Sequence, residues 1–96
     1  MRSALAAAIA IASIAAATAA SAQPPAGALS CTGCHPASSR VTSPVVRLAG
    51  LDRAAIVRAM QEFRSGQRAG TVMDRIAKGF TDEEIQAIAA WLASQK

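Results

Sequence analysis

The chain has 96 residues, a formal net charge of +4 and 52% hydrophobic residues, with no Tyr, two Phe and one Trp. This length allows at most one small domain and excludes a Rossmann unit or a TIM barrel. No basic run contains interleaved aromatic residues, so the charge does not indicate a nucleic-acid partner. A domain of this size is marginal on protein atoms alone, so we expect a disulfide, a metal, a cofactor or a partner to supplement its core.

The first 22 residues are typical of a secretory signal peptide. Arg2 supplies the basic start, residues 4–20 are almost wholly Ala and Ile, and a small-x-small cleavage pattern ends at Ala22. A retained membrane anchor is the alternative, but the segment is slightly short and Ala-dominated for a stable span. We expect cleavage after Ala22, which leaves a domain at 23–96 in the periplasm with no stable membrane span. Loss of Arg2 lowers the net charge from +4 to +3.

The first half of the domain is predicted to hold one short and one longer helix. Residues 26–35 allow a short helix with Leu29 as its main apolar anchor, and the Ser-, Thr- and Pro-rich residues 36–44 predict a loop. A clear helix is predicted over 51–64, because apolar residues recur there at positions i, i+4 and i+7. Asp52 suits the N-cap of this helix.

The C-terminal part of the domain predicts two more helical segments. Residues 72–78 suit a short helix closed by Gly79. Thr81 and Glu84 have the spacing of a capping box, which opens the last helix. No stretch alternates between apolar and polar residues with a period of two, so the sequence predicts an all-α fold.

The pentapeptide Cys31-Thr32-Gly33-Cys34-His35 has the C-x-x-C-H spacing of c-type haem attachment. Two thiols one helical turn apart reach the two vinyl groups on one porphyrin edge, and the adjacent imidazole projects to the iron. We therefore predict one covalent haem c per chain, with thioether bonds to Cys31 and Cys34 and with His35 as an axial iron ligand. The haem would also supply the core that so small a domain lacks.

Three other interpretations of the cysteine pair fit less well. A thioredoxin-type redox site needs a βαβ context, which the sequence does not predict. A disulfide between Cys31 and Cys34 would close a very small loop and contribute little to stability. A structural zinc site needs four ligands, and only the two cysteines and His35 are evident.

The second axial ligand is expected to be a methionine, because a soft thioether ligand raises the reduction potential of haem iron. Met60 and Met73 are the two candidates in the domain. Met60 lies inside a predicted helix on its apolar face, where Met is more often part of the core. Met73 lies in the irregular stretch before the last helix, where the chain can bend across the second haem face, so we favour Met73.

Taken together, these residues resemble a class I monohaem cytochrome c over nearly all of the domain. Further similarity lies at Leu48-Ala49-Gly50 and Trp91-Leu92. The segment from Met73 to Phe80 is similar to the cytochrome subunit of flavocytochrome c sulfide dehydrogenase and to related small periplasmic cytochromes. The resemblance implies a small cytochrome c fold of about three to five helices wrapped around one covalent haem, with Met73 as the second axial ligand.

The resemblance also implies contacts around the haem. The first and last helices of the family cross beside it, and Leu29 and Trp91 are the residues placed for that contact. In the family a proline carbonyl accepts a hydrogen bond from Nδ1 of the axial histidine. Here Val46 occupies that position and Pro44 lies slightly upstream, so the carbonyl that orients His35 belongs to one of these two residues.

With both axial positions filled, we expect an electron-transfer protein or subunit rather than an enzyme acting alone. The resemblance implies a flavoprotein partner, the FAD-containing subunit of a sulfide dehydrogenase. The alternatives are a free soluble carrier that serves a terminal oxidase or another periplasmic redox enzyme, a small peroxidase-like enzyme if Met73 does not bind iron, and a haem-free disulfide module. A basic rim for docking is predicted at Arg40, Arg68, Arg75 and Lys78.

Overall fold

The computed structural model describes residues 23–96, and the predicted signal peptide at 1–22 lies outside this range. The described part of the chain contains no strand, which confirms the all-α prediction. Its elements in chain order are α1 (Ala28–Cys31), α2 (Arg53–Ser65), α3 (Met73–Ile76), the 3-10 helix η1 (Ala77–Gly79) and α4 (Asp82–Ser94).

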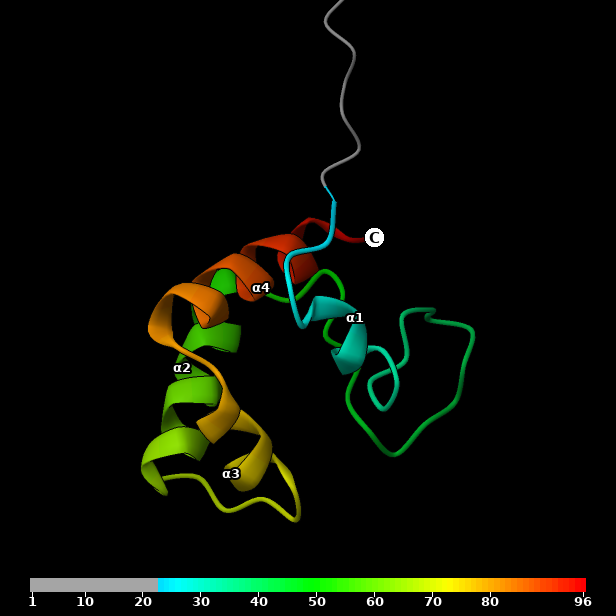
Figure 1. Ribbon diagram of the computed structural model, residues 1–96. Helices are drawn as coiled ribbons and strands as arrows, with labels where there is room; N and C mark the ends of the chain where they lie inside the picture. The colour runs from blue at the N-terminus through cyan, green and yellow to red at the C-terminus, as the bar shows by residue number, and fades with distance from the viewer. Residues whose placement is uncertain (1–22) are drawn as a thin grey trace, which may run out of the picture.

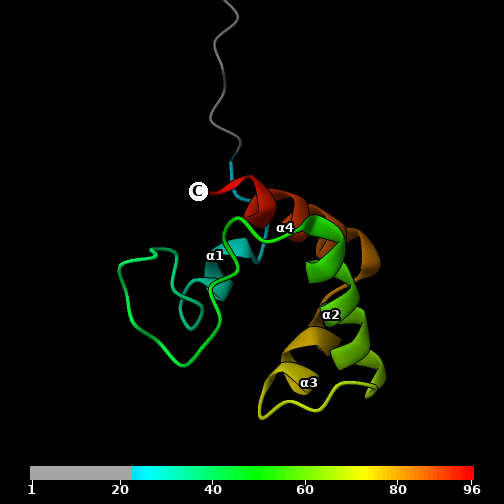
Figure 2. The same cartoon turned by 180° about the vertical axis from the view of Figure 1, so that it is seen from behind.

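The last helix joins the two halves of the fold (Figure 1). α4 packs against both α1 and α2, whereas α3 and η1 pack against α2. Both views place α1 and the long loop after it to one side beneath α4, and α2 and α3 to the other side (Figure 2). The C-x-x-C-H motif and the Met73 segment are therefore carried by different halves of the molecule, and α4 connects them.

The two long helices begin where their capping residues require. Asp52 caps α2, and its Oδ2 accepts a hydrogen bond from the Ala55 backbone N–H at 2.9 Å. At α4, the Thr81 hydroxyl accepts from the Glu84 N–H at 3.2 Å, while the Glu84 carboxylate accepts from the Thr81 N–H at 2.8 Å. These hydrogen bonds confirm both predicted N-caps. Each cap satisfies a backbone N–H group that the first helical turn leaves unpaired.

The first helix occupies only part of the range 26–35 that the sequence allows, and it buries a different residue from the one expected. It spans only four residues, Ala28 is fully buried, and Leu29 is 63% exposed, so the expectation of Leu29 as its main apolar anchor is wrong. The physical reason lies at Gly27, whose φ of 84° lets the chain turn sharply into α1. After this turn Ala28, a residue small enough for close packing, belongs to the buried cluster with α4.

The buried core is small and formed mainly by α2 and α4. In residues 23–96 it comprises eight hydrophobic residues, of which three are alanine: Ala28, Ile56, Val57, Ala77, Ile85, Ile88, Ala89 and Leu92. Met60, Phe80 and Trp91 pack against it while remaining partly exposed. None of the helices in this range has the length and apolarity to cross a membrane.

Candidate functional site

The C-x-x-C-H motif lies at the end of α1, where the helical turn continues beyond the last helical residue. The backbone N–H groups of Cys34 and His35 both donate to the Cys31 carbonyl, at 3.3 and 2.9 Å. Cys31 is half-buried and Cys34 is exposed, and both thiols are free. The turn thus presents two available thiols and an imidazole from one short stretch of chain, as thioether attachment requires.

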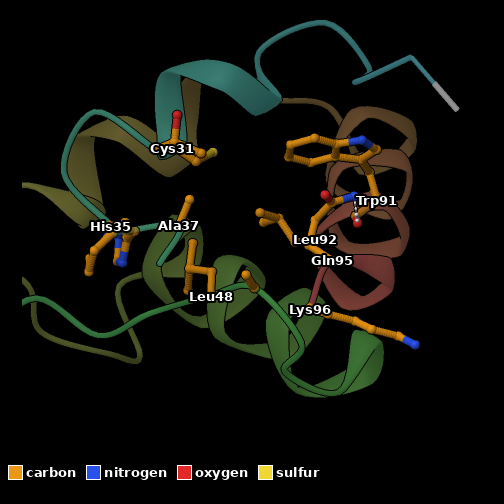
Figure 3. A pocket seen from close by; sticks show the side chains of 11 residues that line it. Cys31, His35, Ala37, Leu48, Trp91, Leu92, Gln95 and Lys96 are labelled. Atoms are coloured by element: carbon orange, nitrogen blue, oxygen red, sulfur yellow. Dashed lines mark hydrogen bonds between the residues drawn. The ribbon is translucent and has the colours of Figure 1, made fainter. Parts of the chain in front are cut away.

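A pocket beside the motif is formed by three parts of the chain (Figure 3). Cys31 and His35 contribute from the motif, Leu48 from the loop before α2, and Trp91 and Leu92 from α4. Cys31 and Trp91 lie on facing sides of this pocket in Figure 3. The first and last helices are in contact, as the resemblance implies. Trp91 and Cys31, at the end of α1, line the pocket, whereas Leu29 does not.

The orientation of His35 is set by the backbone of the following loop. Its Nδ1 lies 2.5 Å from the carbonyl oxygen of Val46. A carbonyl can only accept, so Nδ1 carries a proton, and in the neutral imidazole the other ring nitrogen, Nε2, keeps a lone pair for a metal. Of the two carbonyls that the sequence left open, the structure selects Val46 rather than Pro44. This arrangement is typical of metal-binding histidines, whose second nitrogen is commonly held by a carbonyl or carboxylate.

The Cys31 thiol is shielded more than its neighbour in the motif. Burial raises the pKa of Cys31 above its ordinary value, outweighing a hydrogen bond with its own backbone that lowers the pKa. Its Sγ lies 3.7 Å from the Gly27 carbonyl, which can accept the weak S–H hydrogen bond. Cys31 therefore remains a neutral thiol at neutral pH, in contact with the apolar core.

The two candidate methionine ligands occupy different environments. Met60 lies within α2 and packs against the hydrophobic core. Met73 is the first residue of α3 and is half-buried. Neither Met73 nor Cys34 lines the pocket that contains Cys31 and His35, so the structure places only part of the predicted site in one cavity.

One residue of the predicted basic rim is engaged within the molecule. The Arg68 guanidinium pairs with the Glu62 carboxylate at 2.7 Å and lies 5.5 Å from the centroid of the Phe63 ring. The sequence contains no local signal for these contacts, which depend on how the chain turns after α2. Arg40, Arg75 and Lys78 are exposed and form no ion pair with the residues at 23–96.

Exposed apolar side chains lie next to the predicted haem-binding residues. Seven large hydrophobic residues in the described range are exposed: Leu29, Val41, Val45, Val46, Leu51, Val72 and Ile76. Leu29 precedes the motif by two residues. Val41, Val45 and Val46 belong to the loop whose backbone bonds His35, and Val72 and Ile76 lie on either side of Met73 in the sequence. Apolar surface on and beside the segments that carry the predicted ligands fits the binding of a large apolar macrocycle such as haem.

No family model matches the chain. It is 39% identical over 66 residues to the cytochrome subunit of sulfide dehydrogenase from Chlorobaculum tepidum, an alignment that covers 69% of this chain and 60% of the relative. It is 37% identical to the thiosulfate dehydrogenase electron acceptor of Stutzerimonas stutzeri, over 68% of this chain and 31% of the relative.

A smaller relative is matched over most of its length. The chain is 31% identical over 70 residues to cytochrome c-554(548) of Halomonas halodenitrificans, and this alignment covers 69% of this chain and 84% of the relative. By contrast, the chain spans less than two thirds of the length of the sulfide and thiosulfate dehydrogenase proteins.

Proposed function

Since this chain belongs to the family of small c-type cytochromes, we propose that it is a single-electron carrier with one covalently attached haem c. The observation that carries the proposal is the geometry of His35. Its Nδ1–H donates to the Val46 carbonyl, which leaves Nε2 of the neutral ring available to bind iron. His35 also directly follows Cys34, the second of the two free thiols of the C-x-x-C motif.

Each residue of the site has a distinct part. Cys31 and Cys34 would hold the haem covalently at the end of α1, through thioether bonds. His35 and Met73 would be the protein ligands of its iron. The haem would supply one-electron iron chemistry, and a thioether ligand would raise its reduction potential. Two protein ligands would leave no coordination position for a substrate, which favours a carrier over an enzyme acting alone.

The proposed partner is a flavoprotein that oxidises reduced sulfur compounds. One relative is named as the cytochrome subunit of a sulfide dehydrogenase and another as the electron acceptor of a thiosulfate dehydrogenase. We place the protein in the periplasm after removal of residues 1–22, where it accepts electrons from the FAD-containing sulfide dehydrogenase subunit. Two rates separate this role from that of a free soluble carrier: reduction of the holoprotein by the FAD-containing subunit, and its oxidation by a terminal oxidase. Rapid reduction by the FAD-containing subunit supports the proposed role, and rapid oxidation by the oxidase without such reduction supports the free carrier.

Substitution of each methionine tests the axial ligand. Met73→Ala in the holoprotein should abolish the weak sulfur-to-iron charge-transfer band of the ferric form. It should also allow rapid binding of cyanide to the ferric form and of carbon monoxide to the ferrous form. Met60→Ala should leave this band unchanged and cost about 2–5 kcal/mol of unfolding free energy, because it opens a cavity beside the core. A band that survives Met73→Ala and disappears in Met60→Ala would reverse the assignment.

A further inference from the structure

The N-terminal end of the segment that carries Met73 is attached to the last turn of α2. The Arg68 backbone N–H donates to the Glu62 carbonyl at 3.1 Å, and the Arg68 side chain donates through Nε to the Glu62 carboxylate at 2.8 Å. Gly70 then passes so close to Phe63 that a Cβ there would lie 3.0 Å from the ring and 3.4 Å from the Cβ of Met73. The chain is therefore fixed against the last turn of α2 shortly before it reaches Met73.

The same turn of α2 holds the C-terminal end of the segment. Arg64 Nη1 donates to the Phe80 carbonyl at 3.1 Å, and its Nη2 pairs with the Asp82 carboxylate at the start of α4. The Arg64 side chain is only 30% exposed, and its hydrogen bond to the Phe80 carbonyl is partly buried, whereas the Asp82 side chain is 63% exposed. The charge-assisted hydrogen bond to the Phe80 carbonyl is therefore the stronger restraint, because an exposed ion pair contributes little.

Two residues of one helical turn thus restrain both ends of the chain around Met73. On the basis of the proposed axial ligation, we propose that Glu62 and Arg64 are positioning residues that hold the Met73 thioether on the iron. Neither residue is a ligand. Each restrains the backbone through a neighbour, Glu62 through Arg68 and Arg64 through the Phe80 carbonyl, and so limits the local opening that would let the thioether leave.

Cyanide binding to the ferric holoprotein measures this restraint, because cyanide can occupy the iron only after the Met73 sulfur has left. Arg64→Met should accelerate cyanide binding about tenfold, the scale expected for loss of a hydrogen bond to a charged group. Glu62→Gln removes the charge but keeps an amide oxygen that can accept from Arg68, so it should accelerate cyanide binding by a smaller factor. Arg64→Lys keeps the charge and one donor, and should restore part of the wild-type rate. Should Arg64→Met fail to fold, Glu62→Gln carries the test.

Arg58→Gln is the matched control. Arg58 also pairs with Glu62, at 3.9 Å, but this exposed contact lies within α2 and does not reach the Met73 segment. The control should therefore bind cyanide at the wild-type rate. Equal acceleration by Arg58→Gln would mean that general loosening of α2, rather than the two end contacts, controls the ligand.

Amide hydrogen exchange of residues 69–80 provides a second readout that does not depend on the iron. Exchange there should increase in Arg64→Met and Glu62→Gln while that of α4 stays unchanged. Unchanged exchange would overturn the restraint itself, and increased exchange without faster cyanide binding would overturn its role in ligation. A wild-type ferric protein that lacks the charge-transfer band would instead overturn Met73 as the ligand and with it the positioning role, while the exchange data would still decide the restraint.

Discussion

A backbone position and an aromatic ring come unusually close where the chain enters α1. A Cβ at Gly27 would lie 2.7 Å from Cε1 of Phe80 and 3.6 Å from Cδ1 of Ile88. Gly66 has the same φ of 84° but has no atom within 4 Å of such a Cβ. Comparing substitutions at the two glycines therefore separates two losses of unfolding free energy: one from the left-handed backbone conformation and one from steric overlap.

Gly27→Ala should destabilise the holoprotein more than Gly66→Ala. The left-handed conformation costs a residue with a Cβ about 1–2 kcal/mol, and overlap with Phe80 should add about 1–3 kcal/mol at Gly27 alone. Denaturant unfolding of both variants, followed by circular dichroism, measures the difference. Equal losses would show that the Phe80 ring moves aside without cost.

At this scale the sequence was informative where chemistry depends on adjacent residues. The spacing of Cys31, Cys34 and His35 predicts their roles because three neighbouring side chains must meet one group. The sequence limits the carbonyl that accepts from His35 Nδ1 to that of Val46 or Pro44. It cannot choose between them, because every residue has a backbone carbonyl whatever its side chain. The contacts of Glu62 and Arg64 were missed for a related reason, because their partners depend on the tertiary course of the chain.

The two long helices depend on caps whose contributions can be measured separately. Thr81→Ala removes the hydroxyl that accepts from the Glu84 N–H and should cost about 1 kcal/mol. Thr81→Ser keeps a hydroxyl and should retain most of the stability. Thermal unfolding of the two holoproteins provides the comparison, and equal losses in both variants would mean that the threonine methyl group, not the cap, is responsible.

The sequence predicts the start of a helix best where a capping residue marks it. The helix predicted over 51–64 is observed at Arg53–Ser65, and the last helix begins directly after Thr81. The segment predicted as one short helix over 72–78 is divided into α3 and η1. The sequence allows a short helix within 26–35 but does not fix its ends, because these depend on the turn at Gly27 and on packing against α4.

At the scale of the whole molecule, the thin core predicts that the fold depends on haem. In residues 23–96, three of the eight buried hydrophobic residues are alanine, and six exposed large hydrophobic residues lie on or beside the segments that carry the predicted ligands. A double variant, Cys31→Ala/Cys34→Ala, should therefore lack a cooperative unfolding transition. Far-ultraviolet circular dichroism during heating measures this, with the wild-type holoprotein as control. A cooperative transition in the haem-free chain would contradict the prediction.

The charge on the surface also predicts how the molecule meets its partner. Arg75 lies in α3 near Met73 and forms no ion pair with the described residues, whereas Arg68 is engaged by Glu62. Arg75→Glu should slow association with an acidic partner surface and weaken its dependence on salt, while electron transfer inside the assembled complex changes much less. Stopped-flow reduction across a salt series measures both rates. Identical salt dependence for the variant and the wild type would exclude a docking role for Arg75.

The bond between His35 and Val46 has an evolutionary consequence. Every amino acid supplies a backbone carbonyl, and the Val46 side chain is 60% exposed, so the identity of residue 46 is not constrained by its bond to the imidazole. Selection can retain the orientation of the histidine while this position drifts among chemically unrelated residues. Descendants of this chain can therefore lose every recognisable trace of the interaction in their sequences and still preserve it in their structures.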